Sequence, residues 1–188
     1  MLNNAMQLLL DVFVQGFAGV LLFRFLLQWL RAPMRNPVGE FIMALSDFAV
    51  LRARRFIPPV RKLDSSSFLL AWAVELIYLV LTLSLEGYPF VNFPLLGLLA
   101  WSAVKLVKIT VYLLMSALVA QAILSWVNPY TPLAPLLAAI THRFLRPLQR
   151  VLPLIGNVDL SPLVLLVICQ IILLVPLAML ESLAVRLL

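Results

Sequence analysis

Long apolar segments, separated by short polar stretches, dominate the pattern of this chain. A helix needs about 20 residues to cross the hydrocarbon layer of a bilayer, which is roughly 30 Å thick. Four segments reach that length, and we predict spans at about 6–30, 66–86, 105–127 and 161–183. The pattern therefore predicts an all-α, polytopic membrane protein with about four transmembrane helices.

Two of these segments are irregular. The apolar stretch at 95–127 is too long for one straight span. Residues 91–104 could be re-entrant, interfacial or part of the third span, and the sequence leaves these three alternatives open. Pro176 lies inside the fourth span, and we expect a bend there because proline removes a backbone hydrogen bond and crowds the preceding turn.

The composition supports a membrane protein. The chain has 188 residues, of which 64% are hydrophobic and only 12% are charged. A single soluble core of this length could not bury that much apolar surface. The net charge of +6 would suggest an acidic partner in a soluble protein. However, the aromatic residues do not alternate with the cations as a base-stacking surface requires, so we expect no nucleic-acid partner.

The cations are distributed unevenly, because ten of the fourteen fall in two loops. Loops rich in Lys and Arg stay in the cytoplasm. We therefore expect both basic loops on the cytoplasmic side and both termini outside. The ten cations are Arg31, Arg35, Arg52, Arg54, Arg55, Arg61, Lys62, Arg143, Arg146 and Arg150.

The chain contains an internal repeat of similar residues at constant spacing. Trp29 and Trp126 extend it once two residues are removed from the longer first loop. We predict two repeats, at 1–90 and 91–188, which insert in the same sense and are therefore parallel. The pairs are Pro37 and Pro132, Ser46 and Thr141, Arg55 and Arg150, Pro58 and Pro153, Asp64 and Asp159, and Ser66 and Ser161.

Each basic loop also carries apolar residues at helical spacing, after Pro37 in one loop and after Pro132 in the other. This pattern predicts an amphipathic helix that lies in the membrane interface, with its cations at lipid phosphates. We expect this face to bind anionic membrane lipids or a membrane protein partner. The alternative is that these helices only cover the cytoplasmic ends of the bundle. The predicted face comprises Arg52, Arg54, Arg55, Arg61, Lys62, Arg143, Arg146 and Arg150.

Several polar residues fall within the spans, where charge is costly and often marks function, and four of them are candidate site residues. Arg24 and Glu75 belong to the first half and could pair, whereas Gln121 and Gln170 lie near the corresponding positions of the second half. One interpretation is snorkelling together with pairing between helices. The other is an ion path, for which four polar residues offer little polar wall.

The sequence offers little for catalysis or for a cofactor. His142 is the only histidine and Cys169 the only cysteine, and they lie at different predicted depths. A multi-cysteine metal site and haem ligation within this chain are therefore not expected. We predict a protein that is not an enzyme and has no catalytic residues, metal or cofactor.

Short motifs at corresponding places in the two halves resemble those of a known family. Tryptophan ends LLQW and ILSW, and the second half continues with LRPLQRVLP and DLSP. The chain is thus similar to the YggT (also YlmG) family of bacterial and plastid membrane proteins, over nearly its whole length. The first half departs from this pattern, with VLRARRFIPP and DSSS in place of the last two motifs.

The resemblance implies an inner-membrane protein. Bacterial members are linked to osmotic-shock resistance and ion homeostasis, and plastid relatives to haem attachment in cytochrome b6 and to nucleoid organisation. We therefore predict a non-enzymatic scaffold or assembly factor of membrane complexes, with an unidentified protein partner; a homo-oligomer is also compatible with the sequence. The alternative is a component of ion or osmotic-stress homeostasis, associated with a channel or transporter. The motif residues are Trp29, Pro37, Pro58, Asp64, Trp126, Pro132, Pro153 and Asp159.

Overall fold

The computed structural model describes residues 2–55, 64–89, 94–128, 130–151 and 159–188. All regular structure in these ranges is helical, as predicted. The elements are α1 (Leu2–Leu9), a π-helical turn η1 (Leu10–Gln15), α2 (Gly16–Trp29), α3 (Pro37–Ala53), α4 (Ser65–Leu85), α5 (Leu95–Val127), α6 (Ala134–Val151), α7 (Ser161–Leu174) and α8 (Pro176–Val185).

Four helical segments of the described chain are long and apolar enough to cross a membrane, which confirms the predicted number. They are Asn3–Trp29, Ser65–Leu85, Leu95–Ser125 and Ser161–Val185. The first joins α1, η1 and α2, and the last joins α7 and α8 across an interruption at Val175. The interruption falls beside Pro176, where the missing amide donor predicted a bend.

The third span differs from the predicted 105–127. Helix α5 is continuous over 33 residues, from Leu95 to Val127. At 1.5 Å per residue it is about 50 Å long, well beyond the thickness of the hydrocarbon layer. Residues 95–104 are therefore continuous with the helix of the third span, whereas residues 91–93 lie outside the described part of the chain.

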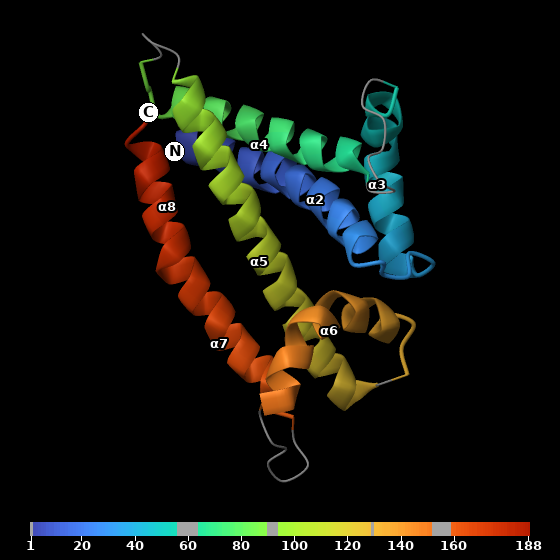
Figure 1. Ribbon diagram of the computed structural model, residues 1–188. Helices are drawn as coiled ribbons and strands as arrows, with labels where there is room; N and C mark the ends of the chain where they lie inside the picture. Colours follow the sequence, from blue (N-terminus) through green and yellow to red (C-terminus); the bar gives the residue numbers. More distant parts are fainter. Residues whose placement is uncertain (1, 56–63, 90–93, 129, 152–158) are drawn as a thin grey trace.

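Helices α3 and α6 lie across the ends of the spans, away from the two termini (Figure 1). Asn36 starts α3, because its Oδ1 accepts a hydrogen bond of 2.9 Å from the amide of Gly39. Pro37 is the first residue of α3, as expected. A Cβ at Gly39 would lie 2.3 Å from the carbonyl oxygen of Met34, so only glycine fits this close turn. Pro132 precedes α6 by two residues rather than starting it.

The two termini lie close together at the opposite end (Figure 1). The Asn3 side chain donates a 3.0 Å hydrogen bond to the carbonyl of Leu85, at the end of α4. The Tyr88 hydroxyl donates to the carbonyl of Leu188. Side-chain packing joins the spans between these ends. One cluster links Leu22 of α2 to Ala71 of α4 and Leu106 of α5, a second links Leu27 and Ala117 to α6, and a third links Leu118 to Leu165 and Cys169.

Candidate functional site

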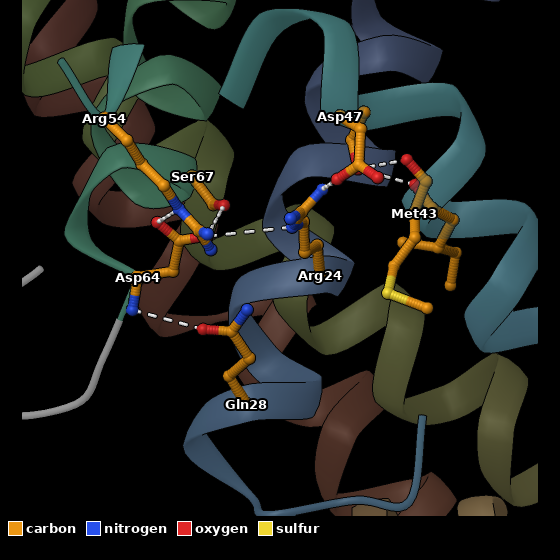
Figure 2. Close-up of polar contacts among 9 residues, drawn as sticks. Arg24, Gln28, Met43, Asp47, Arg54, Asp64 and Ser67 are labelled. Carbon is orange, nitrogen blue, oxygen red and sulfur yellow. Dashed lines mark hydrogen bonds and ion pairs between the residues drawn. The ribbon is translucent and has the colours of Figure 1, made fainter. Parts of the chain in front are cut away.

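Four charged side chains meet at the junction of α2, α3 and α4, and we call Arg24, Asp47, Arg54 and Asp64 the charged cluster. Arg24 belongs to α2 and Asp47 to α3, whereas Arg54 follows α3 and Asp64 precedes α4. Figure 2 shows Arg24 between Asp47 and Asp64, with Arg54 also pointing to Asp64. Two cations and two anions give it no net charge. The cluster joins the end of α3 and the start of α4 to the middle of α2.

Arg24 is almost fully buried, with 4% of its surface exposed. Its guanidinium donates hydrogen bonds to Asp47 Oδ1 at 2.6 Å and to Ser46 Oγ at 2.7 Å. The Ser46 hydroxyl donates in turn to the carbonyl of Ile42 at 2.6 Å. The suggested pair of Arg24 with Glu75 is therefore wrong: among the described residues, the acids that pair with Arg24 are Asp47 and Asp64.

Asp64 is the most deeply buried member of the charged cluster, with 1% of its surface exposed. Its Oδ2 lies 2.6 Å from Arg54 Nη2 and 3.7 Å from Arg24 Nε, and it accepts a 2.9 Å hydrogen bond from the Ser67 hydroxyl. Burial opposes ionisation, but the bonds from Arg54 and Ser67 outweigh it and hold the pKa of Asp64 below its usual range. The same bond raises the pKa of Arg54. Asp64 is therefore an ionised anchor.

The corresponding positions of the second half make similar contacts without the charges. The Thr141 hydroxyl donates to Gln121 Oε1 at 2.5 Å, much as Ser46 contacts Arg24. Gln149 donates to Asp159 Oδ2 at 2.8 Å, where the first half has Arg54 and Asp64. Asp159 Oδ1 also accepts from the amide of Ser161 at 2.8 Å. The duplication remains a prediction; the second half has Gln121 and Gln149 where the first half has the cluster cations Arg24 and Arg54.

Most of the predicted basic face is exposed on α3 and α6. Arg52, Arg55, Arg146 and Arg150 are exposed and form no ion pair within the described part of the chain. Arg54 was expected at lipid phosphates, but it binds Asp64 instead. Arg143 is exposed and lies over the ring of Trp29, with its guanidinium carbon 4.9 Å from the ring centre. Arg61 and Lys62 lie outside the described residues.

The remaining polar residues of the spans have different surroundings. Glu75 of α4 is fully buried, with 0% of its surface exposed, and neither carboxylate oxygen has a hydrogen-bond partner among the described residues. Gln15 lies within reach of it, and Lys105 acts on it electrostatically. Gln170 is exposed on α7, so it does not share the burial of Glu75.

A polar chamber of about 580 Å³ lies beside the π-helical turn η1. Asp11 and Gln15 line it from the first span, and Lys105 and Lys108 from α5. Asp11 accepts a 2.7 Å hydrogen bond from the Tyr78 hydroxyl, and Lys108 pairs with Glu181 at 2.5 Å. Single π-helical turns occur often at functional sites.

The motif residues occupy the ends of helices. Trp29 ends α2, Pro37 starts α3, and Asp64 immediately precedes α4. Asp159 stands two residues before α7. Pro58 and Pro153 lie outside the described residues, as does the side chain of Trp126.

The sequence did not single out Asp47, Ser67 or Gln28, whose Oε1 accepts a hydrogen bond of 3.2 Å from the amide of Asp64. Asp47 follows Ser46, which is buried together with Ile42 and Val50 on one side of α3. The spacing of 42, 46 and 50 is a helical signal, but the apolar residues Phe41, Leu45 and Phe48 hid it by suggesting a different buried side.

The charged cluster has a structural role. Its cations and anions neutralise one another, and the ion pairs between them hold α2, α3 and the start of α4 in fixed positions relative to each other. The exposed cations on α3 and α6 can meet an anionic surface.

Comparison with known proteins places this architecture in a family. The CCB3/YggT family model matches residues 3–85 and 100–180. The uncharacterized protein PA0392 of Pseudomonas aeruginosa is 32% identical over 164 residues, covering 86% of this chain and 83% of its own. The uncharacterized protein YggT of Escherichia coli is 28% identical over 170 residues, covering 90% and 87%. No solved structure matches. The chain belongs to the CCB3/YggT family.

Proposed function

We propose that this protein is a non-enzymatic scaffold or assembly factor of the bacterial inner membrane, which holds a membrane protein partner against its basic face. The observation that carries the proposal is the set of exposed cations Arg52, Arg55, Arg146 and Arg150. They come from α6, the end of α3 and the turn that follows α3, and both helices lie across the ends of the spans, away from the termini (Figure 1). Apolar side chains on α3, including Phe41 and Phe48, are exposed beside them. Exposed cations with apolar neighbours suit both lipid phosphates and a membrane-embedded partner.

Crosslinking in the native membrane tests the scaffold. We expect reproducible protein crosslinks to α3 and α6, and at least a fivefold loss when Arg52, Arg55, Arg146 and Arg150 are all changed to glutamine, since each cation contributes about 1 kcal/mol near an anionic surface. Gln149→Ala on α6 is the matched control without a charge change. Arg54 is left unchanged because it holds Asp64. Crosslinks that persist in this quadruple variant would contradict the proposal.

The orientation is part of the same proposal. The excess of cations on the loops supports a cytoplasmic position for α3 and α6, with both termini external. Reporters fused after Lys62 and after Gln149 are expected to be active as cytoplasmic enzymes and inactive as enzymes that need export. Activity of the exported reporter at either site would contradict the orientation.

A second candidate function is a component of ion or osmotic-stress homeostasis. The observation that favours it is Glu75, which is fully buried without a hydrogen-bond partner among the described residues. An ionisable residue of this kind inside a span often marks an ion or proton path. Gln15 lies within reach of Glu75 and lines the polar chamber. Ion flux in vesicles that falls in Glu75→Gln while the crosslinks to α3 and α6 persist would favour this function over the scaffold.

A further inference from the structure

An apolar groove of about 440 Å³ lies between α2, α5 and α7, with α6 across one end. Phe23 and Leu26 line it from α2, Leu114 from α5, and Leu165 and Ile172 from α7. Its volume lies within the range of small-molecule sites, about 300–1,000 Å³. It differs from the polar chamber beside η1, because its wall is almost entirely hydrocarbon.

The position of the groove relates it to the bilayer. Along α7 it extends from Leu165 to Ile172, about 10 Å at 1.5 Å per residue. It begins four residues after the start of that span. The groove therefore occupies the part of the hydrocarbon layer next to α6, and some of its lining, such as Ile168 with 37% of its surface exposed, is open to the surroundings. An apolar groove open to lipid is filled by hydrocarbon rather than by water.

The end of the groove nearest α6 carries a cation. Arg143 lines it, and its guanidinium lies over the ring of Trp29, which also lines it. Stacking on an aromatic ring fixes a guanidinium in one orientation without using its hydrogen-bond donors. Arg143 forms no ion pair with any described acid. Its charge is therefore available to an anion at the depth where tryptophan marks the membrane surface.

We infer that this groove binds one anionic phospholipid, with an acyl chain between α2, α5 and α7 and the phosphate on Arg143. Charge complementarity selects this occupant. A second copy or a partner helix would also satisfy the apolar wall, but it would leave the Arg143 guanidinium without its anion. An arginine guanidinium can donate two parallel hydrogen bonds to one phosphate. The inference goes beyond the proposed scaffold, because the site lies within the bundle and needs no protein partner.

Photocrosslinking in nanodiscs tests the site on the purified protein. The probe is phosphatidylglycerol with a diazirine on one acyl chain, diluted into phosphatidylcholine. We expect labelling at groove residues such as Ile168 and Ile172, which excess unlabelled phosphatidylglycerol removes and excess phosphatidylcholine does not. Arg143→Gln is expected to reduce the labelling about fivefold, the equivalent of one cation near a charged headgroup.

Two further variants separate the site from general effects. Arg35→Gln removes an exposed cation that does not line the groove, and labelling should be unchanged. Ile168→Trp fills the groove while keeping Arg143, and labelling of Ile172 should disappear although circular dichroism remains that of the folded protein. Labelling that is insensitive to Arg143→Gln, or that is no stronger at Ile168 and Ile172 than at outward-facing Leu174, would overturn the inference. The proposed scaffold is tested separately, by the loss of protein crosslinks in the variant with all four of Arg52, Arg55, Arg146 and Arg150 changed to glutamine.

Discussion

Replacing Asp64 with alanine is expected to lower the free energy of unfolding by about 3 kcal/mol, or the melting temperature by about 6–12 °C. Removing one partner of a buried ion pair leaves the others uncompensated, which typically costs about 3–5 kcal/mol. The lower end applies here because Arg54 is partly exposed and water can solvate it, and because Arg24 keeps Asp47. Thermal unfolding of the purified protein in detergent measures the effect.

The second half provides the matched control. Asp159 is exposed and bonds the neutral side chain of Gln149 and the amide of Ser161. Asp159→Ala should therefore cost only about 1 kcal/mol, as the loss of a helix cap does. Asp64→Asn keeps the shape and an acceptor for Ser67 but loses the charge, so it should resemble Asp64→Ala. Equal losses for Asp64→Ala and Asp159→Ala would show that the charged cluster adds no stability.

Replacing Glu75 with methionine is expected to raise the free energy of unfolding by about 1–3 kcal/mol, or the melting temperature by about 2–12 °C. The carboxylate is buried without a hydrogen-bond partner among the described residues, so an apolar side chain of similar length removes a cost of desolvation. Thermal unfolding in detergent measures the change, and Glu86→Met, at an exposed acid just after α4, should stay within about 0.5 kcal/mol.

Whether Glu75→Met raises or lowers the free energy of unfolding bears on the function of the protein. A residue whose removal stabilises the protein is kept for a reason other than stability. Stabilisation by Glu75→Met together with altered ion flux in Glu75→Gln would support the second candidate function. Destabilisation by Glu75→Met would mean instead that contacts of the Glu75 carboxylate, such as one with Gln15, hold α4 in place.

The hydrophobic pattern was enough to place three of the four spans to within a few residues. The second span was predicted at about 66–86 and lies at Ser65–Leu85, because an apolar segment of this length satisfies all its backbone hydrogen bonds within lipid by forming a helix. The start of α5 could not be predicted, because an apolar sequence at 95–104 is compatible with a re-entrant segment, an interfacial segment and a part of the third span. The interruption next to Pro176 was predictable because it follows from covalent structure alone.

The partner of Arg24 was not predictable in the same way. Glu75 was the conspicuous acid because it stands inside an apolar span, whereas Asp47 stands in a loop helix with several charges. Which side of α3 packs inward depends on tertiary contacts, and α3 has apolar residues on two sides. The buried side contains Ile42, Ser46 and Val50, which brings Asp47 to Arg24. A serine within a buried helical stripe was the available clue.

The charged cluster also has a consequence for biogenesis. A lone arginine inside a span opposes insertion by the translocon, by about 2.5–3.5 kcal/mol at the centre and by less near an end, and Arg24 lies five residues from the end of the first span. Arg24 leaves the ribosome before either Asp47 or Asp64, because both aspartates stand later in the chain. The first span thus enters the bilayer with an uncompensated charge, and the ion pairs form only after α3 and the head of α4 have been synthesised. Stable residence of α2 in the membrane is therefore coupled to translation of the rest of its own half.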